Sequence, residues 1–246
     1  MIRFILCILS VVLFLILSIP CLALTWLIGK FSTSAQDISS MRIVQWALGI
    51  VLFLAGTKVT FIGEENIPKD QAVLFVGNHR SIFDVIITYH RARRPVGYVA
   101  KIELTKVPIF STWGKRMRCL FFDRNDLRQG MRMIMTGIDL VKEGISVCIY
   151  PEGTRNKNED EAELLEFHEG SFRIAYKSGC PVIPLAVSNS VNIWEAQFPK
   201  VRKTHVVVEY GRPIYPADLT REEQRHLGIR TREEIRQMLI RNRSLI

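Results

Sequence analysis

The sequence predicts an α/β fold: a mostly parallel sheet with helices on both faces, preceded by an N-terminal two-helix membrane segment. Two observations carry this prediction. After residue 57, short apolar runs alternate with amphipathic helical stretches, which is the pattern of a parallel sheet covered on both sides. Before residue 57, the chain is dominated by two apolar runs.

The first apolar run covers residues 4–28. As one helix it would measure ~37 Å, enough to cross the ~30 Å hydrocarbon layer. A cleaved signal peptide is the alternative, but its apolar region is usually shorter, ~7–15 residues. The second run, residues 43–55, is shorter and includes Gln45. It could complete a hairpin, lie in the membrane interface, or be a buried core helix. We therefore assign residues 1–56 to membrane-anchoring helices.

Residues 57–219 form the expected catalytic domain, in which predicted strands and helices alternate. Strands are expected at residues 57–62, 72–76, 96–100, 119–122, 145–150, 181–187 and 204–210. Helices are expected from about Val85, at 103–113 with an interruption at Pro108, at 127–142 and at 171–177. The tail, residues 220–246, has helical spacing and many arginines. It predicts a basic amphipathic helix that packs on the domain as a surface helix.

The net charge and the cysteine spacing limit the classes of partner and site that the chain can have. The formal net charge of the 246 residues is +9, which indicates an anionic partner: a phosphate-bearing ligand, nucleic acid or an acidic lipid surface. A nucleic-acid-binding domain is disfavoured because the chain has no recognised motif and no aromatic stacking platform. The five cysteines show neither Cys-x-x-Cys nor zinc-type Cys/His spacing. We therefore expect reduced, buried thiols in a domain that faces the cytosol, and no metal.

His79 follows a predicted strand, and Asp84 lies five residues later. On one straight helix these side chains would be ~140° apart and could not meet. If Ser81 caps a helix with Asp84 at its third position, His79 stays in the preceding loop and the carboxylate can point back to it. Asp84 could then hold one imidazole nitrogen while the other accepts a proton from a hydroxyl. Alternatively, Asp84 only completes a capping box.

A second candidate segment is a turn that directly follows another predicted strand. Such a turn can present backbone N–H groups and a guanidinium to a phosphate, although a structural Glu–Arg pair is the alternative. Because the carboxyl ends of parallel strands share one edge, we expect this turn to converge there with His79, Lys101 and Arg124. The residues of the turn are Glu152, Gly153, Thr154 and Arg155.

Residues 60–215 resemble the glycerolipid acyltransferase family, and specifically the 1-acyl-glycerol-3-phosphate acyltransferases. Four family blocks occur in order, at residues 78–84, 101–124, 150–155 and 181–184. The resemblance implies that His79 acts as general base on the free hydroxyl of a lysophosphatidate, that Asp84 orients His79, and that the hydroxyl attacks an acyl thioester without an acyl-enzyme.

The resemblance also implies the partners and the location. Arg155 and Lys101, with Arg124, would hold the phosphate of the acceptor, and Glu152, Gly153 and Thr154 would shape its pocket. No cofactor is implied; the co-substrate is acyl-ACP or acyl-CoA. The acceptor is a membrane lipid, so we expect a membrane location, the cell membrane if the source is bacterial, with the catalytic domain facing the cytoplasm.

Two departures from the family leave the acceptor open. Residues 167–170 are Phe-His-Glu-Gly, where the family commonly has Phe followed by lysines, and the connector at 156–166 is long and acidic. Another lyso-lipid or glycerol-3-phosphate could therefore be the acceptor. A non-catalytic membrane lipid-binding protein is the alternative from a different class of function.

Overall fold

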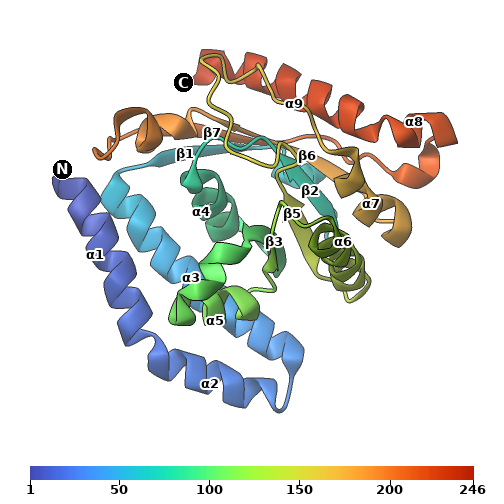
Figure 1. The fold of residues 1–246 in the computed structure, drawn as a ribbon. Coiled ribbons are helices and arrows are strands. Elements are labelled where there is room, and N and C mark those ends of the chain that lie inside the picture. Colours follow the sequence, from blue (N-terminus) through green and yellow to red (C-terminus); the bar gives the residue numbers. More distant parts are fainter.

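A seven-stranded sheet forms the centre of the structure, a computed structural model that describes residues 1–246 (Figure 1). The strand order is β1-β7-β6-β2-β5-β3-β4, and every neighbouring pair is parallel except β6 and β7. The mostly parallel α/β fold is thus confirmed. The strands are β1 (Lys58–Ile62), β2 (Leu74–Gly77), β3 (Val96–Lys101), β4 (Leu120–Phe122), β5 (Ser146–Ile149), β6 (Val182–Ser188) and β7 (His205–Tyr210).

Helices cover both faces of this sheet, because successive strand residues point to opposite sides. Leu74 and Val76 of β2 lie in one hydrophobic core, and the neighbouring Val73 lies in the other. The first face carries α6 (Leu127–Lys142), α7 (Arg173–Ser178) and α9 (Leu227–Asn242) (Figure 1). The second face carries α3 (Thr33–Ala55), α4 (Ile82–Arg91) and α5 (Pro108–Arg116).

The first apolar segment forms two helices, α1 (Ile2–Leu17) and α2 (Ile19–Gly29), which are bent by 50° relative to each other. The prediction of one straight helix over residues 4–28 was therefore wrong. Pro20 explains the break, since proline lacks the N–H that a continuous helix needs and clashes with the preceding turn. At the bend, the hydroxyl of Ser18 accepts a hydrogen bond of 2.8 Å from the indole N–H of Trp113 in α5.

The second apolar run belongs to α3, whose 23 residues are long and apolar enough to cross a membrane. However, α3 is fastened to the α/β domain. Its Gln45 side chain donates to the carbonyl oxygens of Tyr89 and Ala92, at 3.0 and 2.6 Å. Near its start, Asp37 forms a two-bond ion pair with Arg118, at 2.9 and 3.0 Å. Of the alternatives for this run, these contacts favour a helix with one side in the core.

Two other helical predictions need adjustment. Pro108 does not interrupt a helix but begins α5, where its missing N–H costs nothing, and a short 3₁₀ helix precedes it. The basic tail is broken into α8 (Arg221–Arg225) and α9, and α9 buries Leu227, Ile235 and Leu239 against the sheet. The 3₁₀ helices are η1 (Glu64–Asn66), η2 (Ile102–Lys106), η3 (Glu169–Phe172), η4 (Ser190–Ile193), η5 (Glu195–Gln197), η6 (Pro216–Asp218) and η7 (Arg243–Leu245).

Candidate active site

The loop between β2 and α4 begins at Asn78, which is fully buried. Its side-chain amide donates to the carbonyl oxygen of Val187 at 3.0 Å and accepts from the N–H of Val187 at 2.8 Å. The amide therefore adds one more pair of hydrogen bonds between β2 and β6. These bonds fix the point at which the chain leaves the sheet, and so place the next residue, His79.

His79 and Asp84 meet as the first sequence interpretation requires. Nδ1 of His79 lies 2.9 Å from Oδ2 of Asp84, and the same oxygen accepts the N–H groups of Arg80 and Ser81, each at 2.8 Å. Ser81 caps α4 by accepting the N–H of Phe83, so the capping box is present as well. Both roles considered for Asp84 coexist. Because a carboxylate only accepts, Nδ1 carries the proton and Nε2 keeps a free lone pair.

The carboxylate of Asp84 is completely buried, and its second oxygen accepts a hydrogen bond from the hydroxyl of Ser190. Ser190 lies in η4, just after β6. Four donors thus surround this side chain: the imidazole, two backbone N–H groups and one hydroxyl. They supply the hydrogen bonds that a buried carboxylate needs, and they leave it little freedom to rotate away from His79.

The other side of the imidazole is held by an aromatic ring. Tyr150, directly after β5, stacks on His79 with ring centroids 4.4 Å apart and planes inclined by 19°. Gly77 makes room for this ring, since a Cβ there would lie 3.0 Å from the Tyr150 side chain. The His79 side chain remains 15% exposed. Its ring is therefore fixed by Asp84 and Tyr150 but still reachable from outside.

Glu152 holds the backbone of His79 and not its ring. One carboxylate oxygen accepts the N–H of His79 and the other accepts the N–H of Leu165, both at 2.9 Å. The N–H of Asn156 in turn donates to the carbonyl oxygen of His79 at 2.7 Å. Burial raises the pKa of Glu152, and the two N–H bonds oppose that rise. Between these contacts the chain reverses at Gly153, whose φ of 69° favours glycine.

Arg155 lies close to the start of α4. Its guanidinium donates to Glu195 at 3.0 Å, and Glu195 also accepts the hydroxyl of Ser81 at 2.6 Å and the N–H of Ile82 at 2.8 Å. The Arg155 side chain is 49% exposed, so it can reach a ligand without unfolding the loop. Neighbouring Thr154 is also exposed.

Lys101 ends β3 and Arg124 follows β4, on the same edge of the sheet as His79. From β2 outward, the neighbouring strands are β5, then β3, then β4. With strands ~4.8 Å apart, the backbone of Lys101 is ~10 Å and that of Arg124 ~15 Å from β2. Both residues are exposed, and His79 forms its side-chain hydrogen bond with Asp84 and with neither of them. The structure therefore gathers these cations along one edge, two and three strands away from the strand that leads to the histidine.

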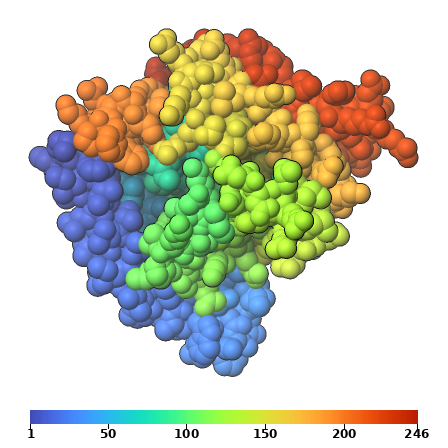
Figure 2. Space-filling model, in the orientation of Figure 1, coloured from blue at the N-terminus to red at the C-terminus, as the bar shows by residue number.

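The site is recessed. In Figure 2 the teal segment that includes α4 is visible only in depth, between the orange, yellow and green segments around it. Such a pocket at the carboxyl end of a parallel sheet is the usual ligand position in open α/β folds.

The sequence interpretation missed three contributors to the site. Ser190 is 106 residues from Asp84 and Glu195 is 114 residues from Ser81, and both lie within short 3₁₀ helices that carry no motif. The stacking role of Tyr150 was also missed. Its only signal is an aromatic side chain directly after a strand, next to Glu152.

Burial makes two of the five cysteines poor nucleophiles. All five are free thiols. Burial raises the pKa of Cys148 to about 12 and that of Cys119 to about 11. These two thiols are therefore protonated at neutral pH and unreactive. Nor do the described side chains include a group of three or more His, Cys, Asp or Glu residues that could hold one metal ion.

A histidine with a free nitrogen, oriented by a buried aspartate at a sheet edge that also carries cations, suits proton transfer from a hydroxyl on an anionic substrate. The chain belongs to the Acyltransferase family, because the model of that family matches residues 58–188.

Individual relatives agree with this assignment. A probable 1-acyl-sn-glycerol-3-phosphate acyltransferase of Mycoplasma pneumoniae is 29% identical over 202 residues, which are 77% of this chain and 74% of that one. The 1-acyl-sn-glycerol-3-phosphate acyltransferase of Borreliella burgdorferi is 32% identical over 155 residues, 63% of this chain and 61% of that one. The crystal structure of the 1-acyl-sn-glycerophosphate acyltransferase PlsC from Thermotoga maritima has the same fold. Its TM-score is 0.80 at 20% identity, with 98% of this chain and 95% of that one covered.

Proposed function

We propose that this protein transfers an acyl group from an acyl thioester to the free sn-2 hydroxyl of 1-acyl-glycerol-3-phosphate and so makes phosphatidate, a step of phospholipid biosynthesis. The observation that carries the proposal is the hydrogen bond from Nδ1 of His79 to Asp84, which leaves Nε2 free to accept a proton. The family match and the names of the relatives support the reaction class.

In the proposed mechanism, Nε2 of His79 takes the proton of the acceptor hydroxyl as its oxygen attacks the thioester carbonyl. A C–O bond forms, the carbonyl becomes an oxyanion, and the intermediate then collapses with cleavage of the C–S bond. The departing thiolate takes the proton back from His79, so the enzyme ends in its starting state. Asp84 stabilises the imidazolium between these steps and keeps Nε2 aimed at the hydroxyl. No cofactor takes part in this sequence.

The acceptor phosphate is proposed to bind Arg155, with Lys101 and Arg124 adding positive charge along the same edge. Arg155 follows β5 and lies close to the start of α4, where its guanidinium and the helix N-terminus both favour an anion. Glu195 already pairs with Arg155, so the phosphate must share or replace that partner. Glu152 and Gly153 shape the turn that presents Thr154 and Arg155.

We infer that the protein is bound to a membrane through α1, α2 and the outer side of α3. Neither α1 nor α2 alone is long enough to cross ~30 Å of hydrocarbon, since 16 residues span ~24 Å and 11 span ~17 Å. Their outer faces and that of α3 are nonetheless apolar and exposed, which suits helices that lie in the interface. Exposed members are Ile5, Leu9, Val12, Ile16, Leu24, Trp26, Trp46 and Phe53.

The α/β domain is proposed to lie on the cytoplasmic side. Its free cysteines suit a reducing compartment, and the acyl thioester donors, acyl carrier protein or coenzyme A, are made there. To test the membrane face, Leu9→Glu together with Ile16→Glu should reduce cosedimentation with phosphatidylglycerol vesicles. Leu127→Glu together with Met131→Glu, the same number of changes at exposed apolar residues of α6, should not. Equal loss in both variants would contradict the assigned face.

The substrate assignment is tested by a panel of acceptors, each offered with acyl-ACP and with acyl-CoA. Lysophosphatidate should be acylated much faster than glycerol-3-phosphate and lysophosphatidylcholine, which lack the apolar chain or the terminal phosphate. Faster acylation of either of the other acceptors would replace the proposed substrate but keep the reaction class. The two donors identify which thioester the enzyme uses.

A further inference from the structure

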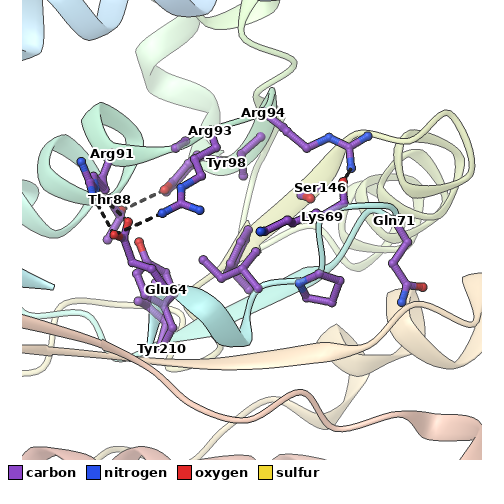
Figure 3. Close-up of a pocket in the computed structure, with 16 residues that line it drawn as sticks. Glu64, Lys69, Gln71, Thr88, Arg91, Arg93, Arg94, Tyr98, Ser146 and Tyr210 are labelled. Carbon is purple, nitrogen blue, oxygen red and sulfur yellow. Dashed lines mark hydrogen bonds and ion pairs between the residues drawn. The ribbon is translucent and has the colours of Figure 1, made fainter. Parts of the chain in front are cut away.

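A separate cavity lies on the α4 side of the sheet, toward the amino ends of β3 and β5 (Figure 3). Its volume is about 260 Å³, close to the lower end of small-molecule sites at roughly 300 Å³. Apolar side chains line its interior, among them Phe75, Val96 and Leu185. None of the proposed catalytic or phosphate-binding residues lines this cavity, so it is distinct from the site at the opposite edge.

The cavity wall carries an excess of positive charge. Lys69, Arg91, Arg93 and Arg94 line it, against the single carboxylate of Glu64. Figure 3 shows the side chains of Lys69 and Arg93 directed toward the same space from opposite sides. Positive side chains that face one volume repel each other, and an anion bound between them offsets this repulsion.

Only one of these cations, Arg91, has its charge balanced by a close ion pair. Arg91 takes both oxygens of Glu64, at 2.7 Å each, whereas Arg93 reaches the same carboxylate at 3.4 Å. Arg94 donates to the carbonyl oxygen of Lys69, which is neutral. Lys69 itself is exposed and has no acidic partner. The wall therefore keeps three cations, Lys69, Arg93 and Arg94, for which the protein supplies little compensating charge.

Polar groups at the inner end connect the cavity to α4. The hydroxyl of Tyr98 donates to Thr88 at 2.8 Å, and the Thr88 hydroxyl donates to the carbonyl oxygen of Asp84 at 2.6 Å. Both Tyr98 and Thr88 line the cavity. A ligand that fills the cavity would thus contact the helix that carries Asp84, without entering the catalytic recess.

We propose that this cavity is a second ligand site, and that it binds an anionic amphiphile. The phosphate or carboxylate head group lies among Lys69, Arg93 and Arg94, and a short apolar chain lies against Phe75 and Leu185. The cavity is too small for a long acyl chain to be enclosed, so a short chain, or the first part of a longer one, fits it.

The test is calorimetric titration of the full chain, held in nonionic detergent, with octyl phosphate below its micelle concentration. Octanoate has the same chain with a carboxylate head, octanol lacks the charge, and inorganic phosphate lacks the chain. Octyl phosphate or octanoate should bind with saturation, and the better of the two identifies the head group. Octanol and inorganic phosphate should bind at least tenfold more weakly. Octanol binding as tightly as both anions would overturn the proposal.

Variants separate this cavity from the catalytic recess, which is also expected to attract a phosphate. Reversing three charges, Lys69→Glu, Arg93→Glu and Arg94→Glu, should weaken binding at least tenfold. The same charge change at exposed arginines of α8 and α9 is the matched control and should leave binding unchanged: Arg221→Glu, Arg225→Glu and Arg230→Glu.

A milder pair, Lys69→Gln with Arg93→Gln, guards against misfolding, because both side chains are exposed. This pair should weaken binding threefold or more while the melting temperature stays within a few degrees. Arg155→Ala should retain octyl phosphate binding in the cavity. If Arg155→Ala abolishes binding and the cavity variants do not, the ligand occupies the catalytic recess and the proposal is wrong, whereas the acyltransferase assignment stands.

Discussion

The ring of Tyr150 lies against the imidazole of His79, with 4.4 Å between centroids and 19° between planes. Together with the 2.9 Å bond from Nδ1 to Asp84, this stack leaves the imidazole one orientation. The tyrosine hydroxyl is buried and has no hydrogen-bond partner. The ring of Tyr150, and not its hydroxyl, is therefore the part that positions the base.

Replacing Tyr150 with leucine should lower kcat/KM about 2- to 10-fold, because an aromatic pair contributes ~0.5–1.5 kcal/mol beyond its buried area. Tyr150→Phe keeps the ring and removes only an unpaired hydroxyl, so its kcat/KM should stay near that of the wild type. The measurement is the rate of phosphatidate formation at varied acceptor concentration. A phenylalanine variant as slow as the leucine variant would show that the hydroxyl matters instead.

Asp84→Asn should slow the reaction ~10²-fold or more if Asp84 supports general-base catalysis. The neutral amide has no negative charge to stabilise the imidazolium, and its N–H₂ group must face either the N–H groups of Arg80 and Ser81 or the hydroxyl of Ser190. Single-turnover rates with labelled thioester measure the loss. Asp218→Asn, at the exposed end of η6, is the matched control. Equal rates for wild type and Asp84→Asn would remove the assigned role.

Arg155→Ala should raise KM for lysophosphatidate, because the variant loses the proposed phosphate contact. The KM for the acyl donor should change little. Arg128→Ala, an exposed arginine at the start of α6, serves as control and should leave both constants unchanged. If only the donor KM rises in Arg155→Ala, then Arg155 binds the thioester carrier and the phosphate assignment is wrong.

The stability of the protein should depend on pH through Glu152. Burial raises the pKa of Glu152 above its ordinary value of 4.5, so the folded state holds the proton to a higher pH than the unfolded state does. Its contribution to the free energy of unfolding is therefore full below about pH 4.5 and is lost as the pH rises through the raised pKa.

Glu152→Gln removes this titration. Denaturant unfolding of both proteins from about pH 4 to about pH 8 measures the effect. The free energy of unfolding of the wild type minus that of Glu152→Gln should fall as the pH rises. A difference that grows with pH would mean that the N–H bonds from His79 and Leu165 outweigh burial and lower the pKa of Glu152.

Much of the fold follows from local sequence patterns. Apolar runs and their turns predict each strand, and the spacing in residues 127–142 predicts α6 with its observed bounds. The order of the strands is not local. β1 pairs in parallel with β7, although β7 lies almost 150 residues later in the chain. The pair β6–β7 is the one antiparallel pair of the sheet. Hydrophobic periodicity contains no information on which buried strands become neighbours.

In the site, too, the local contacts can be predicted from the sequence and the long-range contacts cannot. The interval from His79 to Asp84, with Ser81 as cap, predicts their contact because all three lie in one turn and the start of one helix. Ser190 and Glu195 complete that turn from a distant loop, and a single sequence carries no signal for such contacts. Lys101 and Arg124 were placed on the correct edge by topology alone, but their distance from His79 depends on the strand order.

The assignment of His79 as the general base is tested by His79→Ala. The measurement is the rate at which the purified full chain converts labelled acyl thioester and lysophosphatidate to phosphatidate. We expect the rate to fall ~10²- to 10⁴-fold while binding of lysophosphatidate is retained, because only the proton acceptor is removed. A variant that makes phosphatidate at the wild-type rate would contradict this assignment.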